Sequence, residues 1–141
     1  MTSNFDPNLK ILVVDDVSSV RRIMKKLLIE LGLRNIEEAA DGEQALTMIN
    51  AKSYQLVISD WNMPKLKGIE LVEKMKADPK LKSIPFIMIT ANNSKEHVIE
   101  AARKGVKCYL GKPFTSEALR DKIVEALKVS DPVAPGTEAA Q

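Results

Sequence analysis

The sequence contains little cysteine and carries almost no net charge. Cys108 is the only cysteine, so the chain cannot form an internal disulfide and does not indicate an oxidising compartment. The formal net charge of +2 is too small to draw the chain strongly to nucleic acid or to an anionic membrane, and both signs of charge are mixed along it. These absences exclude a disulfide-stabilised small domain and disfavour a nucleic-acid-binding protein.

Long hydrophobic runs are also absent, since a membrane span needs about 20 consecutive apolar residues. The segment Met1–Asn8 is polar and lacks the apolar centre of a secretory signal. We therefore expect a cytoplasmic protein with no membrane insertion. Residues 1–8 are expected to form a flexible arm, and residues 130–141, with two prolines and a glycine among small residues, a disordered tail. Residues 9–129 then form one folded domain.

Two common kinds of catalytic motif are missing. The sequence has no GxxxxGK[ST] loop for nucleotide phosphates and no visible Ser-His-Asp set. His97, the only histidine, is predicted to be a solvated helix residue, and Cys108 a small buried strand residue. Any chemistry is therefore expected from carboxylates, hydroxyls and lysines.

Apolar runs alternate with segments of helical periodicity. Strands are predicted at Lys10–Asp15, Ile36–Ala40, Gln55–Ser59, Pro85–Ile89 and Cys108–Leu110, the second of them a short strand. This alternation favours an α/β fold, a doubly wound five-stranded parallel sheet of the flavodoxin-like order 2-1-3-4-5 made of five βα units. In such sheets the chemistry lies at the carboxyl ends of the strands.

The helical segments carry start signals and apolar faces. Asp41, Ser94 and Thr115 are predicted to cap helices, and a further helix is expected from about Lys65 to Ala77. The first helix is predicted to end at Gly32 and to carry its apolar residues on one side: Val20, Ile23, Met24, Leu27, Leu28 and Leu31.

Three acidic residues follow neighbouring strands of the predicted sheet. Asp15 and Asp16 come after the first strand, and Asp60 comes after the third. Carboxylates that meet in one pocket repel one another, so a cation is expected to neutralise them. Oxygen ligands suit a hard ion, Mg²⁺ or Mn²⁺. The alternative is that Asp15 and Asp16 merely cap the helix that follows.

A hydroxyl and an ammonium follow the fourth and fifth strands. Thr90 and Lys112 are placed to bind the oxygens of a phosphoryl group on Asp60, which predicts phosphoryl transfer to a carboxylate. Taken alone, Thr90 is more often a strand-end hydroxyl bonded to backbone, and Lys112 more often a surface charge. Each residue becomes a specific sign of a phosphoryl site only as one member of a set whose positions all fall at strand ends.

These residues resemble the signature of the response-regulator receiver family of two-component signalling. The resemblance rests on Asp15-Asp16, Asp60, Thr90-Ala91 and Lys112-Pro113-Phe114, and it covers about Lys10 to Lys128. The segment Ser59–Pro64 is similar to the stretch around the phosphorylated aspartate in the chemotaxis members of the family.

The resemblance implies a role for each site residue. Asp60 would be the phosphoacceptor, with Thr90 and Lys112 as the other catalytic residues. Thr90 and Tyr109 would also form a switch pair, two residues that move together on phosphorylation. Without the resemblance, an aromatic residue such as Tyr109 on an edge strand would be interpreted as a packing residue. The metal would be held by the carboxylates of Asp15 (through a water), Asp16 and Asp60 and by the backbone carbonyl of Asn62. The protein would catalyse its own phosphorylation and slow dephosphorylation rather than act as an enzyme on other substrates.

The resemblance also implies partners. A monomer would receive the phosphoryl group from a histidine kinase of the CheA type and then bind a flagellar motor switch protein or another target, with a phosphatase as a further partner. The implied partner surface consists of Lys95, Val98, Ala102, Tyr109 and Lys122. A phosphorelay intermediate and a Mg²⁺-dependent phosphohydrolase remain as alternatives.

Three positions depart from the family pattern. Asn92 replaces an acidic residue, Lys67 stands where an aspartate is common, and Gly111 is unusually small. These differences leave the lifetime of the acyl phosphate and the identity of the partners open.

Overall fold

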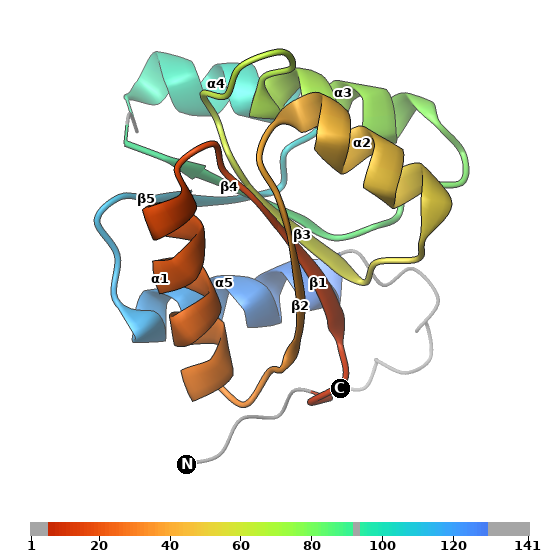
Figure 1. Cartoon of the computed structure of the whole chain (residues 1–141). Helices are drawn as coiled ribbons and strands as arrows, with labels where there is room; N and C mark the ends of the chain where they lie inside the picture. The colour runs from red at the N-terminus through yellow and green to blue at the C-terminus, as the bar shows by residue number, and fades with distance from the viewer. Residues whose placement is uncertain (1–5, 92–93, 130–141) are drawn as a thin grey trace.

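The computed structural model describes residues 6–91 and 94–129, which form one central sheet flanked by helices (Figure 1). Strands and helices alternate along these residues: β1 Lys10–Val14, α1 Ser18–Glu30, β2 Asn35–Ala39, α2 Gly42–Ala51, β3 Leu56–Asp60, α3 Gly68–Ala77, β4 Phe86–Thr90, α4 Lys95–Arg103, β5 Cys108–Gly111 and α5 Ser116–Val129. All strand pairs are parallel, in the order β2-β1-β3-β4-β5. The predicted flavodoxin-like order is confirmed.

The apolar runs became the central strands β1, β3 and β4 because their side chains are buried on both faces of the sheet, whereas the edge strands β2 and β5 are only partly buried. Leu12 and Val14 join the core beneath α2, α3 and α4, whereas Ile11 and Val13 join the core beneath α1 and α5. Figure 1 shows these two helical layers on opposite sides of the sheet. Helices therefore cover both faces of the sheet, and a polar site can form at the carboxyl edge of the strands.

The predicted helix caps are present. The carboxylate of Asp41 accepts from the backbone N–H of Gln44 at 2.8 Å, and the Gln44 side chain accepts from the N–H of Ala40 at 2.7 Å. The hydroxyl oxygens of Ser94 and Thr115 accept from N–H groups three residues further on, at 3.3 and 3.0 Å. Each bond satisfies a donor that the helix leaves unpaired.

The predicted start of one helix was wrong. In α1, Ile23 lines a cavity together with Val20, Met24 and Leu27, as expected for one apolar side, although Ile23 is 59% exposed. The helix expected from about Lys65 begins at Gly68. Lys65 has a φ of 69°, a left-handed conformation that an α-helix does not contain. The strand bounds differ from the predictions by one residue at several ends, and Asp60 and Thr90 are the last residues of their strands.

The expected terminal segments lie mainly outside the described residues. Of the N-terminal arm, residues 6–8 are described, and the carbonyl of Pro7 accepts from the N–H of Arg34 at 3.3 Å. The expected tail at 130–141 lies outside the described range. Among the described helices, none has the length and apolar character needed to cross a membrane.

Candidate functional site

The carboxyl edge of the sheet brings three acidic side chains together. β1 and β3 are neighbours, with Val14 beside Ser59, so Asp15 and Asp16 lie next to Asp60. One carboxylate oxygen from each of the three lies within 4.8 Å of the others. The structure therefore places the aspartates that the sequence singled out in a single cluster.

The cluster is electrostatically unfavourable by itself. Burial raises the pKa of Asp15 above its ordinary value, and the negative charges of Asp60 and Asp16 raise it further. A hydrogen bond from the backbone N–H of Val17, at 2.9 Å, and the positive charge of Lys112 lower the same pKa and partly offset the burial. Ionised Asp15 therefore needs positive charge nearby.

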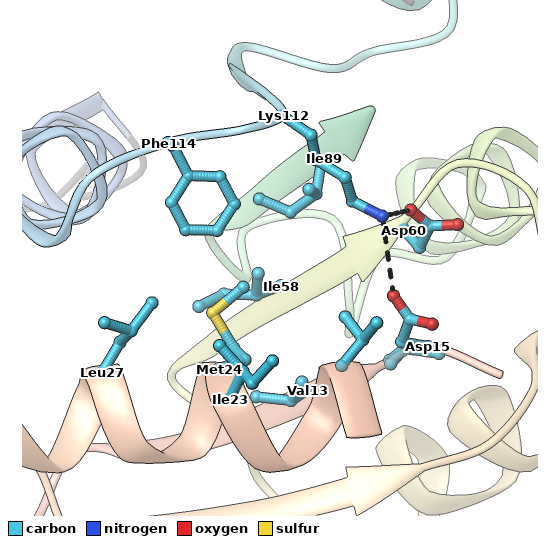
Figure 2. Close-up of a pocket in the computed structure, with 12 residues that line it drawn as sticks. Val13, Asp15, Ile23, Met24, Leu27, Ile58, Asp60, Ile89, Lys112 and Phe114 are labelled. Carbon is cyan, nitrogen blue, oxygen red and sulfur yellow. Dashed lines mark ion pairs between the residues drawn. The ribbon is translucent and has the colours of Figure 1, made fainter. Parts of the chain in front are cut away.

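Lys112 supplies one such charge. Its Nζ lies 2.9 Å from Oδ1 of Asp60 and 4.0 Å from Oδ2 of Asp15, as the dashed lines in Figure 2 show. The peptide bond that follows, between Lys112 and Pro113, is cis. The ammonium sits at the charged end of a small cavity of about 50 Å³, whose remaining walls are mostly apolar: Val13, Val14, Val20, Ile23, Met24, Leu27, Ile58, Ile89 and Phe114. The Asp60 side chain of this ion pair is 14% exposed and that of Lys112 is 34% exposed, so solvent screens the pair in part.

The other sequence-predicted residues lie on β4, β5 and the loop after β3. Thr90 is 2% exposed, and its carbonyl accepts from the N–H of Lys112 at 2.8 Å, which joins the ends of β4 and β5. Tyr109 is half-buried, packs against the core beneath α2, α3 and α4, and has a pKa raised by burial. The N–H of Asn62 donates to Oδ2 of Asp60 at 3.2 Å, so this loop folds back onto the carboxylate.

The cluster fits a small divalent cation. Three carboxylate oxygens within one ion's reach form a hard, negatively charged donor set, and Mg²⁺ and Mn²⁺ prefer oxygen ligands. Asp16 is exposed, which leaves the cluster open to solvent for the waters that Mg²⁺ retains. The residues that would hold the ion are Asp15, Asp16 and Asp60.

The expected partner residues are arranged around the β5 edge of the sheet. Lys95, Val98 and Ala102 are exposed on α4. Lys122, on α5, is half-buried and its Nζ lies 3.2 Å from a carboxylate oxygen of Glu125.

Of the three positions that depart from the family pattern, two are described. Gly111 ends β5 beside Thr90, and Lys67 directly precedes α3. Asn92 lies outside the described residues.

Sequence reasoning missed two residues that shape the acidic loop. The guanidinium of Arg21 donates to the backbone carbonyl of Asp15 at 2.7 Å and to Glu38 at 2.8 Å, which lowers the pKa of Glu38. Gly68 leaves room for the backbone of Asp60, because a Cβ there would collide with the Asp60 carbonyl oxygen. The pairing of Arg21 had no local signal, whereas a glycine shortly after the acidic residue was a weak hint of close backbone approach.

The prediction that His97 is a solvated helix residue was wrong. Its ring stacks on Trp61, with centroids 3.6 Å apart, and its Nε2 is buried without a hydrogen-bond partner in the described part of the chain. The helical pattern correctly placed His97 on α4. The helical pattern did not predict that Trp61 stacks on the His97 ring, because Trp61 lies far away in the sequence, directly after β3.

Known proteins resemble this chain in sequence and in fold. The family described as "Response regulator receiver domain" matches residues 11–124. The chemotaxis protein CheY-3 of Vibrio cholerae serotype O1 is 46% identical over 123 residues, which cover 87% of this chain and 95% of that protein. The structure of the Vibrio cholerae chemotaxis protein CheY4 aligns with a TM-score of 0.78 and 33% identity, over 85% of this chain and 99% of that one.

A third relative is described with its metal. The receiver domain of the sensor histidine kinase PA1611 from Pseudomonas aeruginosa PAO1 aligns with a TM-score of 0.78 and 26% identity, over 86% of this chain and 98% of that one. Its structure is described with a magnesium ion coordinated in the active site cleft. With most of its length matched by the family and 46% of 123 aligned residues identical to a CheY protein, this chain belongs to the response regulator receiver family.

Proposed function

We propose that this protein is a response regulator that is phosphorylated on Asp60 by a histidine kinase in a Mg²⁺-dependent reaction, and that it acts in flagellar chemotaxis. The observation that carries the proposal is the cluster of Asp15, Asp16 and Asp60 with the Lys112 ammonium 2.9 Å from Asp60. These are the parts that phosphoryl transfer to a carboxylate needs: a nucleophile, metal ligands and a fixed positive charge.

In the proposed reaction, a carboxylate oxygen of Asp60 attacks the phosphorus of the donor in line. A new P–O bond forms to Asp60 as the bond between phosphorus and the donor nitrogen breaks, and its electron pair leaves with the donor histidine. Lys112 faces the negative charge on the transferring group, and the Thr90 hydroxyl donates a hydrogen bond to one of its oxygens. A bound Mg²⁺ would supply further positive charge at the same oxygens.

The buried position of Asp15 supports the metal requirement. Because burial and two neighbouring carboxylates disfavour its ionised form, a bound divalent cation would stabilise the charged cluster that the reaction uses. The magnesium described in the PA1611 receiver domain, a relative of the same fold, supports the same assignment.

We further propose that phosphorylation shifts an equilibrium between two conformations through Thr90 and Tyr109 and so changes the affinity for a target protein. The surface involved would be Lys95, Val98, Ala102, Tyr109 and Lys122. Flagellar chemotaxis is favoured because CheY-3, which shares 46% identity over most of both chains, is named a chemotaxis protein. A histidine kinase of the CheA type would be the donor, and the cytoplasm would be the location.

The proposal is tested by measuring binding to a flagellar motor switch protein before and after treatment with acetyl phosphate and Mg²⁺. We expect affinity to rise by roughly 5- to 150-fold, the usual size of a coupling between two sites. Unchanged affinity would contradict the chemotaxis role. Rapid, reversible transfer of the phosphoryl group to a purified histidine phosphotransfer protein would instead favour a phosphorelay intermediate, and sustained turnover of a chromogenic phosphate ester would favour a phosphohydrolase.

A further inference from the structure

Trp61 and His97, the only tryptophan and the only histidine of the chain, stack on each other. Their ring centroids are 3.6 Å apart and their planes differ by 26°. Trp61 directly follows Asp60 and is 5% exposed. His97 lies in the first turn of α4, where its backbone N–H donates to the hydroxyl oxygen of Ser94 at 3.3 Å. The contact therefore joins the loop beside the site to the helix of the proposed partner surface.

The backbone around Trp61 is already fixed on the side of the sheet. Its N–H donates to the carbonyl of Ile89 at 3.0 Å, and its carbonyl accepts from the N–H of Gly68 at 2.9 Å. The next N–H, from Asn62, donates to the Asp60 carboxylate at 3.2 Å. The Trp61 ring is therefore attached to a backbone segment, residues 60–62, that is bonded to β4 and to the start of α3 and that carries the nucleophile and a candidate metal ligand.

The imidazole of His97 is placed for ring contact rather than for hydrogen bonding. Nε2 is buried and has no hydrogen-bond partner among the residues described in the structure. Burying a nitrogen without a partner costs free energy, and stacking between aromatic rings offsets part of that cost. A histidine that only solubilised α4 would point this nitrogen into solvent.

We propose that His97 is a positioning residue, which acts through Trp61 to hold residues 60–62 in the arrangement that accepts a phosphoryl group. This inference rests on the proposed function and adds a physical link between the site and α4. By thermodynamic reciprocity, a ligand that orders the loop around Asp60 also orders the stack and the first turn of α4. The same helix carries the proposed partner residues Lys95, Val98 and Ala102.

The test measures binding of beryllofluoride with Mg²⁺, an analogue of the phosphoryl group, through the fluorescence of Trp61. Three variants are compared with the wild type: His97→Ala, which removes the stack, His97→Phe, which keeps an aromatic ring there, and Glu100→Ala, a matched control at an exposed position of α4. Both alanine variants gain helix propensity in the same helix.

We expect His97→Ala to weaken beryllofluoride binding by roughly fivefold or more, the lower end of usual site-to-site coupling. His97→Phe should bind within about twofold of the wild type, and Glu100→Ala should be unchanged. The ligand-induced change in Trp61 fluorescence should shrink in His97→Ala alone. Rescue by phenylalanine separates positioning through the ring from any role of the imidazole nitrogens.

Urea unfolding of each variant shows whether it is folded at the assay temperature, and His97→Gln takes the place of His97→Ala if the alanine variant does not fold. Lower stability of these variants with beryllofluoride affinity equal to that of the wild type would overturn the positioning role, because the stack would then be purely structural. If the wild type itself does not bind beryllofluoride, the proposed function fails, and the inference fails with it.

Discussion

The ammonium nitrogen of Lys112 lies 2.9 Å from a carboxylate oxygen of Asp60, across the gap between the ends of two strands that are not neighbours. β4 separates β3 from β5, and the long lysine side chain reaches over it. A second carboxylate, that of Asp15, lies 4.0 Å from the same nitrogen. Lys112 therefore offsets repulsion within the acidic cluster and faces the atom proposed as nucleophile.

Replacing Lys112 with methionine should slow phosphorylation from acetyl phosphate by about 100-fold, the usual cost of removing one group that stabilises charge in a transition state. The rate can be followed by intact-protein mass spectrometry over time. Lys107→Met is the matched control, because Lys107 is an exposed lysine just before β5. Equal rates for the two variants would show that Lys112 has no part in the transfer.

Magnesium should raise the melting temperature, because the ion binds a cluster that exists only in the folded chain. At a concentration ten times its dissociation constant, the ion should add about 1.4 kcal/mol to the free energy of unfolding. Differential scanning fluorimetry over a range of millimolar Mg²⁺ measures the shift. Asp16→Asn should lose most of it, whereas Asp121→Asn, an exposed aspartate on α5, should keep it. A wild-type melting temperature independent of Mg²⁺ would count against the metal site.

Arg21→Gln should destabilise the protein by about 1–3 kcal/mol, because it removes charge-assisted hydrogen bonds that tie α1 to the backbone of Asp15 and to Glu38. Arg22→Gln provides the control, since Arg22 is the exposed neighbour on the same helix. Urea unfolding of both variants gives the difference. Similar stabilities for the two would mean that the bonds of Arg21 contribute nothing net.

A cluster of Glu37, Lys52 and Tyr54 at the edge strand β2 should make stability depend on acid pH. The hydroxyl of Tyr54 donates to Glu37, and this bond is the main reason why the pKa of Glu37 is lowered from 4.5, with Lys52 as a second cause. A carboxyl group whose pKa is lower in the folded chain stabilises the fold above its unfolded pKa. That contribution is lost as pH falls through the folded pKa.

Tyr54→Phe should therefore reduce the free energy of unfolding by about 0.5–1.5 kcal/mol at neutral pH. The difference from the wild type should shrink as pH falls below the ordinary glutamate value of 4.5. Urea unfolding at a series of pH values measures both curves. A difference that stays constant down to low pH would show that packing, rather than the bond to Glu37, accounts for the loss.

The fold could be read from the sequence because its signals are local. The central strands β1, β3 and β4 are apolar runs, and helices begin at side chains, such as Asp41, that bond to N–H groups three residues away. The acidic cluster followed from topology, since parallel neighbours end at the same edge of the sheet. Both inferences needed only the order of elements along the chain.

The remaining features depend on contacts that sequence does not encode locally. The apolar pattern put Ile23 on the same side of α1 as Met24, but it did not show that Ile23 would be 59% exposed. The bonds of Arg21 and the stack of His97 on Trp61 each join residues from separate elements. Such pairs depend on the distances between packed elements, which apolar periodicity does not determine.

The most direct test of the account is to treat the protein with acetyl phosphate and Mg²⁺ and to map the modified residue by peptide mass spectrometry. We predict one phosphoryl group per chain, on Asp60, and none in Asp60→Asn, which should stay folded because it removes a charge from a repelling cluster. A phosphoryl group on another residue, or wild-type labelling of Asp60→Asn, would contradict the account.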